Sequence, residues 1–164
     1  MFPFNYIICS NQMGNGNFGK VFKIKEINPP HTILICKIYD YSKFKEYENE
    51  KKILNLITQG KDFINNYIVK ISNVEVFLEN SDDFNVDSNK LVFNYLNHGQ
   101  LCDYLYIVPN INQIKESHIK LLCYKILQGI KIFHEKNISH NKIDIKNIMF
   151  DNDFNPIIIH FSEA

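Results

Sequence analysis

The stretch Ile138–Met149 reads ISHNKIDIKNIM and gathers polar side chains suited to acid–base and metal chemistry between apolar neighbours. Before it, apolar residues in Glu116–Lys136 recur every three or four positions, which predicts a long helix with a broad apolar face. After it come a polar turn, D-N-D-F-N, the strand-like run P-I-I-I and the tripeptide H-F-S. We therefore expect a helix, a polar loop and a short strand in that order.

The stretch resembles the catalytic loop of protein kinases, written H-R-D-L-x-x-x-N. His140 and Asn147 match the two ends of that motif. The resemblance puts Asn141 at the arginine, Lys142 at the catalytic aspartate, and Asp144 at the lysine that the family carries two places further on. The frame of the loop is present, but the residue that would accept the substrate proton is replaced.

The tripeptide H-F-S, His160–Ser162, resembles the D-F-G motif of the same family. His160 follows Lys142 by 18 positions and Asn147 by 13, which are the offsets that kinases keep. The resemblance therefore puts His160 at the aspartate that binds magnesium.

A glycine-rich segment near the start, G-N-G-N-F-G-K-V, resembles the kinase phosphate loop G-x-G-x-x-G-x-V through Gly14, Gly16, Gly19 and Val21. A dinucleotide-binding fingerprint shares the first six places but needs a helix directly afterwards. Here K-V-F-K-I-K-E-I alternates apolar and polar residues, which predicts a strand and hence a hairpin.

The apolar segment Thr32–Tyr39 contains one charged residue, Lys37, which is costly to bury without a partner. The resemblance to kinases implies a partner on the next helix, expected over Glu46–Ile57, where Glu50 matches the family's glutamate. We predict that Lys37 and Glu50 form an ion pair. The resemblance matches them to the kinase lysine and glutamate that serve the ATP phosphates. It puts Ile35 at the position of a small alanine that packs against the adenine in kinases, so the larger isoleucine would reduce the space for the adenine ring.

The resemblance implies an α+β, protein-kinase-like fold. Residues 1–96 would form an N-lobe, an antiparallel sheet with one helix, the glycine-rich loop and the hinge. Residues 97–164 would form part of a helical C-lobe that ends just after the D-F-G position. Around the nucleotide, Phe93 would be the gatekeeper, Leu96 would belong to the hinge and Met149 would form the opposite wall.

Composition restricts the function further. Lysine plus arginine and aspartate plus glutamate both number 18, so no net charge favours nucleic acid or a membrane surface. We find no signal peptide or membrane-spanning run and expect a cytoplasmic protein. The cysteines are far apart, form no C-x-x-C pair and are expected to be reduced and buried. They are Cys9, Cys36, Cys102 and Cys123.

The resemblance implies ATP and Mg²⁺ as cofactors, with weakened Mg²⁺ binding. Magnesium prefers oxygen ligands, and His160 in place of a carboxylate leaves Asn147 as the evident oxygen donor. A lysine, with an ordinary pKa of about 10.4, does not accept a proton at neutral pH. The sequence therefore predicts an impaired pseudokinase that regulates or scaffolds a protein partner and retains some ATP binding.

Two alternatives stay open. In a weakly active serine/threonine kinase, Lys142 and Asp144 would exchange the roles of the family's aspartate and lysine. Alternatively, the chain is a fragment of a longer kinase gene, because the family's remaining lower lobe is absent after H-F-S. In that case the apolar face of Ile119–Phe133 would lack packing and would attract a partner. The residues matching the kinase's stacked spine are present, namely Leu54, Ile71, His140 and Phe161.

Overall fold

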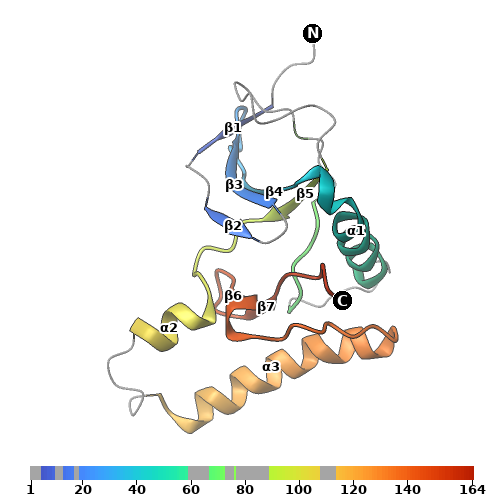
Figure 1. Ribbon diagram of the computed structural model, residues 1–164. Coiled ribbons are helices and arrows are strands. Elements are labelled where there is room, and N and C mark those ends of the chain that lie inside the picture. Colours follow the sequence, from blue (N-terminus) through green and yellow to red (C-terminus); the bar gives the residue numbers. More distant parts are fainter. Residues whose placement is uncertain are drawn as a thin grey trace. The chain divides into compact units, whose positions relative to one another are not determined.

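The N-terminal strands form one antiparallel sheet (Figure 1). The computed structural model describes residues 5–9, 13–16, 19–58, 67–72, 76, 89–107 and 114–164. Its sheet has the order β1-β3-β4-β5, and β2 also pairs with β3. The strands are β1 Tyr6–Ile8, β2 Gly14–Gly16, β3 Gly19–Glu26, β4 Ile33–Tyr39 and β5 Lys90–Asn94. The antiparallel sheet predicted from the sequence is confirmed.

The two faces of this sheet differ because successive strand residues point to opposite sides. One face packs into an apolar core, to which β3, β4 and β5 contribute alternate residues. Its members are Tyr6, Phe22, Ile24, Leu34, Cys36, Ile38, Val76 and Val92. The residues between them in the strands, including Val21, Ile35 and Lys37, therefore occupy the other face.

A helix follows strand β4. The 3-10 turn η1, Tyr41–Lys43, leads into α1, Phe44–Thr58, which is slightly longer than the predicted helix Glu46–Ile57. Ile53, Leu54 and Ile57 on this helix are all buried.

The C-terminal part contains α2 Leu101–Ile107, α3 Glu116–Glu135, the 3-10 turn η3 Ile145–Asn147 and the hairpin of β6 Ile148–Phe150 with β7 Pro156–Ile158. Helix α3 packs against β7 (Figure 1). Their approach is close at Gly129, where an added Cβ would lie 2.9 Å from Cδ1 of Ile158 and 3.2 Å from the carbonyl oxygen of Tyr67. A glycine at this point permits that packing.

The predicted lack of packing along the face Ile119–Phe133 applies to only part of it. Phe133 is fully buried, and Leu122 and Ile126 pack against a cluster of α2 and β6 residues. Other large apolar residues of α3 are exposed, namely Ile119, Leu121, Tyr124 and Leu127, and two of them, Ile119 and Leu127, belong to the predicted apolar face.

The chain divides into two compact units. The first contains Met1–Lys51 and Lys70–Tyr95, and the second contains Lys52–Val69 and Leu96–Ala164. Helix α1 thus contributes residues to both units. The predicted division into an N-lobe, residues 1–96, and a partial C-lobe, residues 97–164, stays a prediction.

Several smaller expectations can also be compared with the structure. Cys36 and Cys102 are buried free thiols as expected, whereas Cys9 and Cys123 are exposed, so the expectation of four buried thiols was wrong. In the segment 68–78, the described residues make isolated bridges at Ile68 and Ile71. Residues 79–88 lie outside the described residues. No helix in the described ranges is long and apolar enough to cross a membrane.

Candidate functional site

The glycine-rich segment forms the predicted hairpin. Gly14 pairs with Val21, and Gly16 pairs with Gly19 at the end of the β2–β3 ladder. Gly19 has φ +146°, and a Cβ there would lie 1.9 Å from the carbonyl oxygen of Ile38. The hairpin can therefore approach β4 only with a glycine at this position.

The predicted nucleotide residues of the first unit share one sheet face. Val21 is opposite Lys37, and Ile35 is opposite Phe93 in the strand register. Because Ile35 and Lys37 are two positions apart, both side chains project from the face opposite the apolar core. The sheet thus brings Val21, Ile35, Lys37 and Phe93 together.

Lys37 and Glu50 form the ion pair predicted from the sequence. Nζ of Lys37 lies 2.6 Å from Oε2 of Glu50, and the two side chains are 12% and 1% exposed. Strand β4 supplies the lysine and α1 supplies the glutamate. Two charges taken out of water require such a partnership.

Tyr39 is a third member of this group, which the sequence analysis did not single out. Its hydroxyl donates a hydrogen bond to Oε2 of Glu50, and Nζ of Lys37 lies 4.6 Å from the centre of its ring. Burial raises the pKa of Tyr39 far above its ordinary value, and the negative charge of Glu50 adds to the effect. Since Tyr39 is two positions beyond Lys37, the strand period already placed it on the same face.

His140 anchors the polar loop in the second unit. It is 4% exposed, its Nδ1 accepts a hydrogen bond from the Lys142 amide at 3.2 Å, and its Nε2 lies 3.1 Å from the Ile159 carbonyl oxygen. These two contacts require a neutral ring with the proton on Nε2. The ring packs edge-on against Phe161, with centroids 4.8 Å apart.

Lys142 forms an ion pair with Glu163. Glu163 was not among the site residues predicted from the sequence. The ammonium group donates to Oε1 of Glu163, and the Asn141 amide donates to the backbone oxygen of Glu163 at 2.9 Å. The hydrogen bond and charge of Lys142 lower the pKa of Glu163. Two neighbouring residues of the polar loop therefore hold the tail just after H-F-S.

Asp144 and Asn147 shape the polar loop. Oδ1 of Asp144 accepts from the Lys146 amide at 2.8 Å and caps η3, while the Asn147 amide donates to the Lys142 carbonyl oxygen at 3.0 Å. The weakly active kinase alternative gives Asp144 the role of the base. In the structure its carboxylate stabilises the turn, and Lys142 pairs with Glu163.

The donor set near His160 does not fit a magnesium ion. His160 has φ +74°, and its Nε2 shares a hydrogen bond of 3.0 Å with the hydroxyl of buried Ser162. Magnesium prefers oxygen ligands in an octahedral arrangement. The carboxylates of Asp144 and Glu163 are already engaged, and the described residues contain no group of three histidine, cysteine or acidic side chains able to hold a metal.

The remaining predicted site residues lie in the second unit. Leu96 is partly buried just after β5, and Met149 lies in β6, where it pairs with Ile157 and bridges to Gln100. Their predicted contacts with a nucleotide stay predictions. Of the predicted spine, Leu54 and Phe161 are fully buried in this unit.

Comparison with known proteins identifies the family. A model described as "Protein kinase domain" matches residues 8–163. The chain therefore belongs to the protein kinase domain family, as the spacing of its loop motifs had indicated.

Individual relatives are distant. Serine/threonine-protein kinase shk2 of Schizosaccharomyces pombe is 26% identical, over 97% of this chain and 25% of that protein. SNF1-related protein kinase catalytic subunit alpha KIN12 of Arabidopsis thaliana is 26% identical, over 96% and 29%. Serine/threonine-protein kinase pakA of Dictyostelium discoideum is 29% identical, over 85% and 10%. The chain thus spans less than a third of each relative.

Proposed function

We propose that this chain is a catalytically impaired kinase-like domain that acts by binding a protein partner, as a regulator or scaffold. The observation that carries the proposal is the ion pair of Lys142 with Glu163. A lysine paired with a carboxylate occupies the position at which kinases carry the residue that accepts the substrate's hydroxyl proton. Loss of such a positioned group typically costs about 10²- to 10⁴-fold in rate.

The magnesium site supports the same proposal. Asn147 matches one of the family's two magnesium ligands, but His160 replaces the other and shares its ring nitrogen with Ser162. In phosphoryl transfer the metal neutralises charge between the phosphates, and positioning together with electrostatics supplies most of the catalysis. Loss of both the base and the metal carboxylate leaves little of either contribution.

Residual ATP binding is part of the proposal, because the group that would hold the phosphates is intact. Lys37 is oriented by Glu50 and Tyr39 on the sheet face that also carries Val21. Ile35 on that face would reduce the space for an adenine. We therefore expect ATP binding that is weak and insensitive to Mg²⁺.

A protein partner and a cytoplasmic location complete the proposal. Ile119, Tyr124 and Leu127 leave apolar side chains of α3 in water, which favours association with another protein. The partner would be an active kinase that the domain regulates, or a component that it scaffolds.

Phosphate transfer tests the proposal directly. The unmodified chain, Lys142→Asp, His160→Asp and the double variant would be incubated with radiolabelled Mg-ATP and a generic protein substrate. We expect no transfer by the unmodified chain or either single variant, because residues that act as a unit are non-additive. Transfer by the unmodified chain would overturn the proposal and favour the weakly active serine/threonine kinase. A thermal shift with ATP, with and without Mg²⁺, reports binding separately.

A further inference from the structure

Helix α3 carries large apolar side chains in water on the side away from β7 (Figure 1). Tyr124 and Leu127 are 58% and 60% exposed, whereas Gly129 and Phe133 on the other side of the helix are buried. Residues three apart are neighbours on a helix surface, so Tyr124 and Leu127 form one apolar strip, with exposed Leu121 at its edge. Such a strip favours contact with another molecule.

Charged residues flank the apolar strip in a symmetrical order. Lys120 lies one helical turn before the strip, and Lys131 lies one turn after it. Nζ of Lys120 lies 2.7 Å from Oε1 of Glu116, and Nζ of Lys131 lies 3.6 Å from Oε1 of Glu135. Both ends of the strip therefore present a lysine nearer the strip and a glutamate further from it. The charges of this face balance, so it does not favour a strongly acidic or basic partner.

We propose that this face of α3 binds the same face of a second copy of the chain, with the two helices antiparallel. A two-fold axis makes such a contact self-complementary. Exact alignment of the helix centres would place like charges opposite each other. A shift of one turn instead places Glu116 of each copy opposite Lys131 of the other, which gives two pairs of opposite charge. The apolar strips of the two copies meet between these pairs.

Forming this contact costs little, because the charges involved are all in water. Each of the four side chains is more than 60% exposed, and ion pairs of this kind within one helix contribute little to stability. They can therefore exchange for pairs between copies. The 20 residues of α3 span about 30 Å, so the interface is small and the dimer should be weak.

This inference goes beyond the proposed function, because it concerns self-association and needs neither ATP nor a regulated kinase. A partner that used the same side chains would compete with the second copy. Self-association and phosphate transfer are measured separately, so either proposal can fail without the other.

Sedimentation of the full chain between about 1 and 100 μM tests the proposal, and we expect conversion of monomer to dimer. Leu127→Asp should weaken the dimer at least about tenfold, because it removes apolar contact from the centre. Glu116→Lys and Lys131→Glu should each weaken it about tenfold by placing like charges opposite each other. Thermal unfolding confirms that each variant is folded.

An equimolar mixture of the Glu116→Lys and Lys131→Glu variants should form dimers as readily as the parent. Each variant then supplies the charge that the other needs, at both pairs. Lost ion pairs within one helix cannot explain such a recovery, because mixing does not restore them.

Cross-linking at a cysteine tests the register of the two helices. The midpoint between positions 116 and 131 lies between Cys123 and Tyr124, so the two-fold axis would pass close to Cys123 of both copies. Cys123 is an exposed free thiol, and a short bismaleimide should link two copies through it. Cys123→Ser should abolish the linked dimer, whereas Cys9→Ser, at the other exposed cysteine of the described residues, should not.

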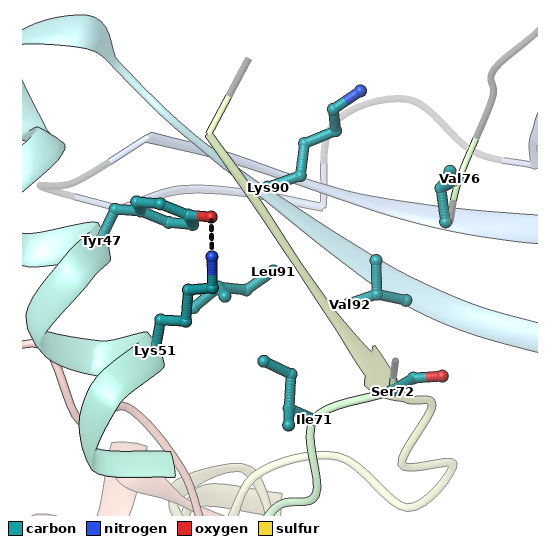
Figure 2. A pocket seen from close by; sticks show the side chains of 8 residues that line it. All are labelled: Tyr47, Lys51, Ile71, Ser72, Val76, Lys90, Leu91 and Val92. Atoms are coloured by element: carbon teal, nitrogen blue, oxygen red, sulfur yellow. Dashed lines mark hydrogen bonds between the residues drawn. The ribbon is translucent and has the colours of Figure 1, made fainter. Parts of the chain in front are cut away.

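Lys51→Glu is the matched control for charge reversal. Lys51 is an exposed lysine of α1 that donates to the Tyr47 hydroxyl and lines a pocket of about 280 Å³ beside β5 (Figure 2). This variant should change the dimer dissociation constant less than about twofold. Equal weakening by Lys51→Glu would overturn the proposal by placing the contact elsewhere. A monomer at all concentrations, assemblies larger than a dimer, or a mixture that fails to form dimers would also overturn it.

Discussion

The ammonium group of Lys142 donates a hydrogen bond to the carboxylate of Glu163, three residues beyond His160. The two residues come from the polar loop and from the tail that follows H-F-S. A position that in kinases carries a negative charge is thus positive here, and a nearby glutamate compensates for the change. Because of this ion pair, replacing Lys142 by an acidic residue should destabilise the fold.

Lys142→Asp should lower the midpoint of thermal unfolding at neutral pH, because it places a carboxylate beside Glu163. The double variant Lys142→Asp/Glu163→Lys should recover most of the loss by restoring opposite charges. Both side chains are more than a third exposed, so added salt should reduce the differences. Scanning calorimetry at low and high ionic strength measures this. Equal midpoints for the parent and both variants would contradict the prediction.

Lys37→Met should destabilise the fold strongly, because it leaves Glu50 charged and 1% exposed without its cation. Breaking a buried pair in this way costs about 3–5 kcal/mol. The exposed control Lys52→Met should change the free energy of unfolding by less than about 0.5 kcal/mol. Urea unfolding provides both values, and similar effects at the two positions would count against a structural role for the pair.

The fold should lose stability at alkaline pH. Burial raises the pKa of the Cys36 thiol from 9.0 to about 12, and the pKa of Tyr39 is raised further. The unfolded chain therefore releases these protons at lower pH than the folded chain. The contribution of the protonated Cys36 thiol to folding stability is fully present below pH 9 and is lost as the pH rises from there towards 12.

Cys36→Val should remove the thiol's share of this alkaline loss, which is at most about 1.4 kcal/mol per pH unit. Urea midpoints measured between neutral pH and about pH 10.5 should then fall less steeply than in the parent. Tyr39→Phe should flatten the upper part of the same range. A parent stability that does not change with alkaline pH would refute the assigned burial of both groups.

Gly129→Ala tests the close contact of α3 with β7. Helix propensity alone favours alanine by about 1 kcal/mol. Its Cβ, however, would lie 2.9 Å from Cδ1 of Ile158, and overpacking of this kind costs about 1–3 kcal/mol. We expect net destabilisation that Ile158→Val relieves, because valine lacks Cδ1. A double-mutant cycle of unfolding free energies without favourable coupling would contradict this.

The sequence supported the sheet and the helices because they depend on local periodicity. The Lys37–Glu50 pair could be predicted because a lone charge in an apolar strand needs a partner and the resemblance to kinases indicated which glutamate supplies it. Tyr39 was missed although its spacing from Lys37 was available, since a tyrosine in a strand is ordinarily a packing residue. Glu163 could not be found by such reasoning. Its position beside Lys142 depends on how the chain turns at His160, where φ is +74°.

The spread of α1 over two compact units has a consequence for cooperativity. The residues of α1 up to Lys51 belong to the first unit, and those from Lys52 onwards belong to the second. Melting the helix removes Glu50 from the first unit and Leu54 from the second in one event. Loss of this helix would therefore remove core residues from both units, which favours their unfolding in one transition.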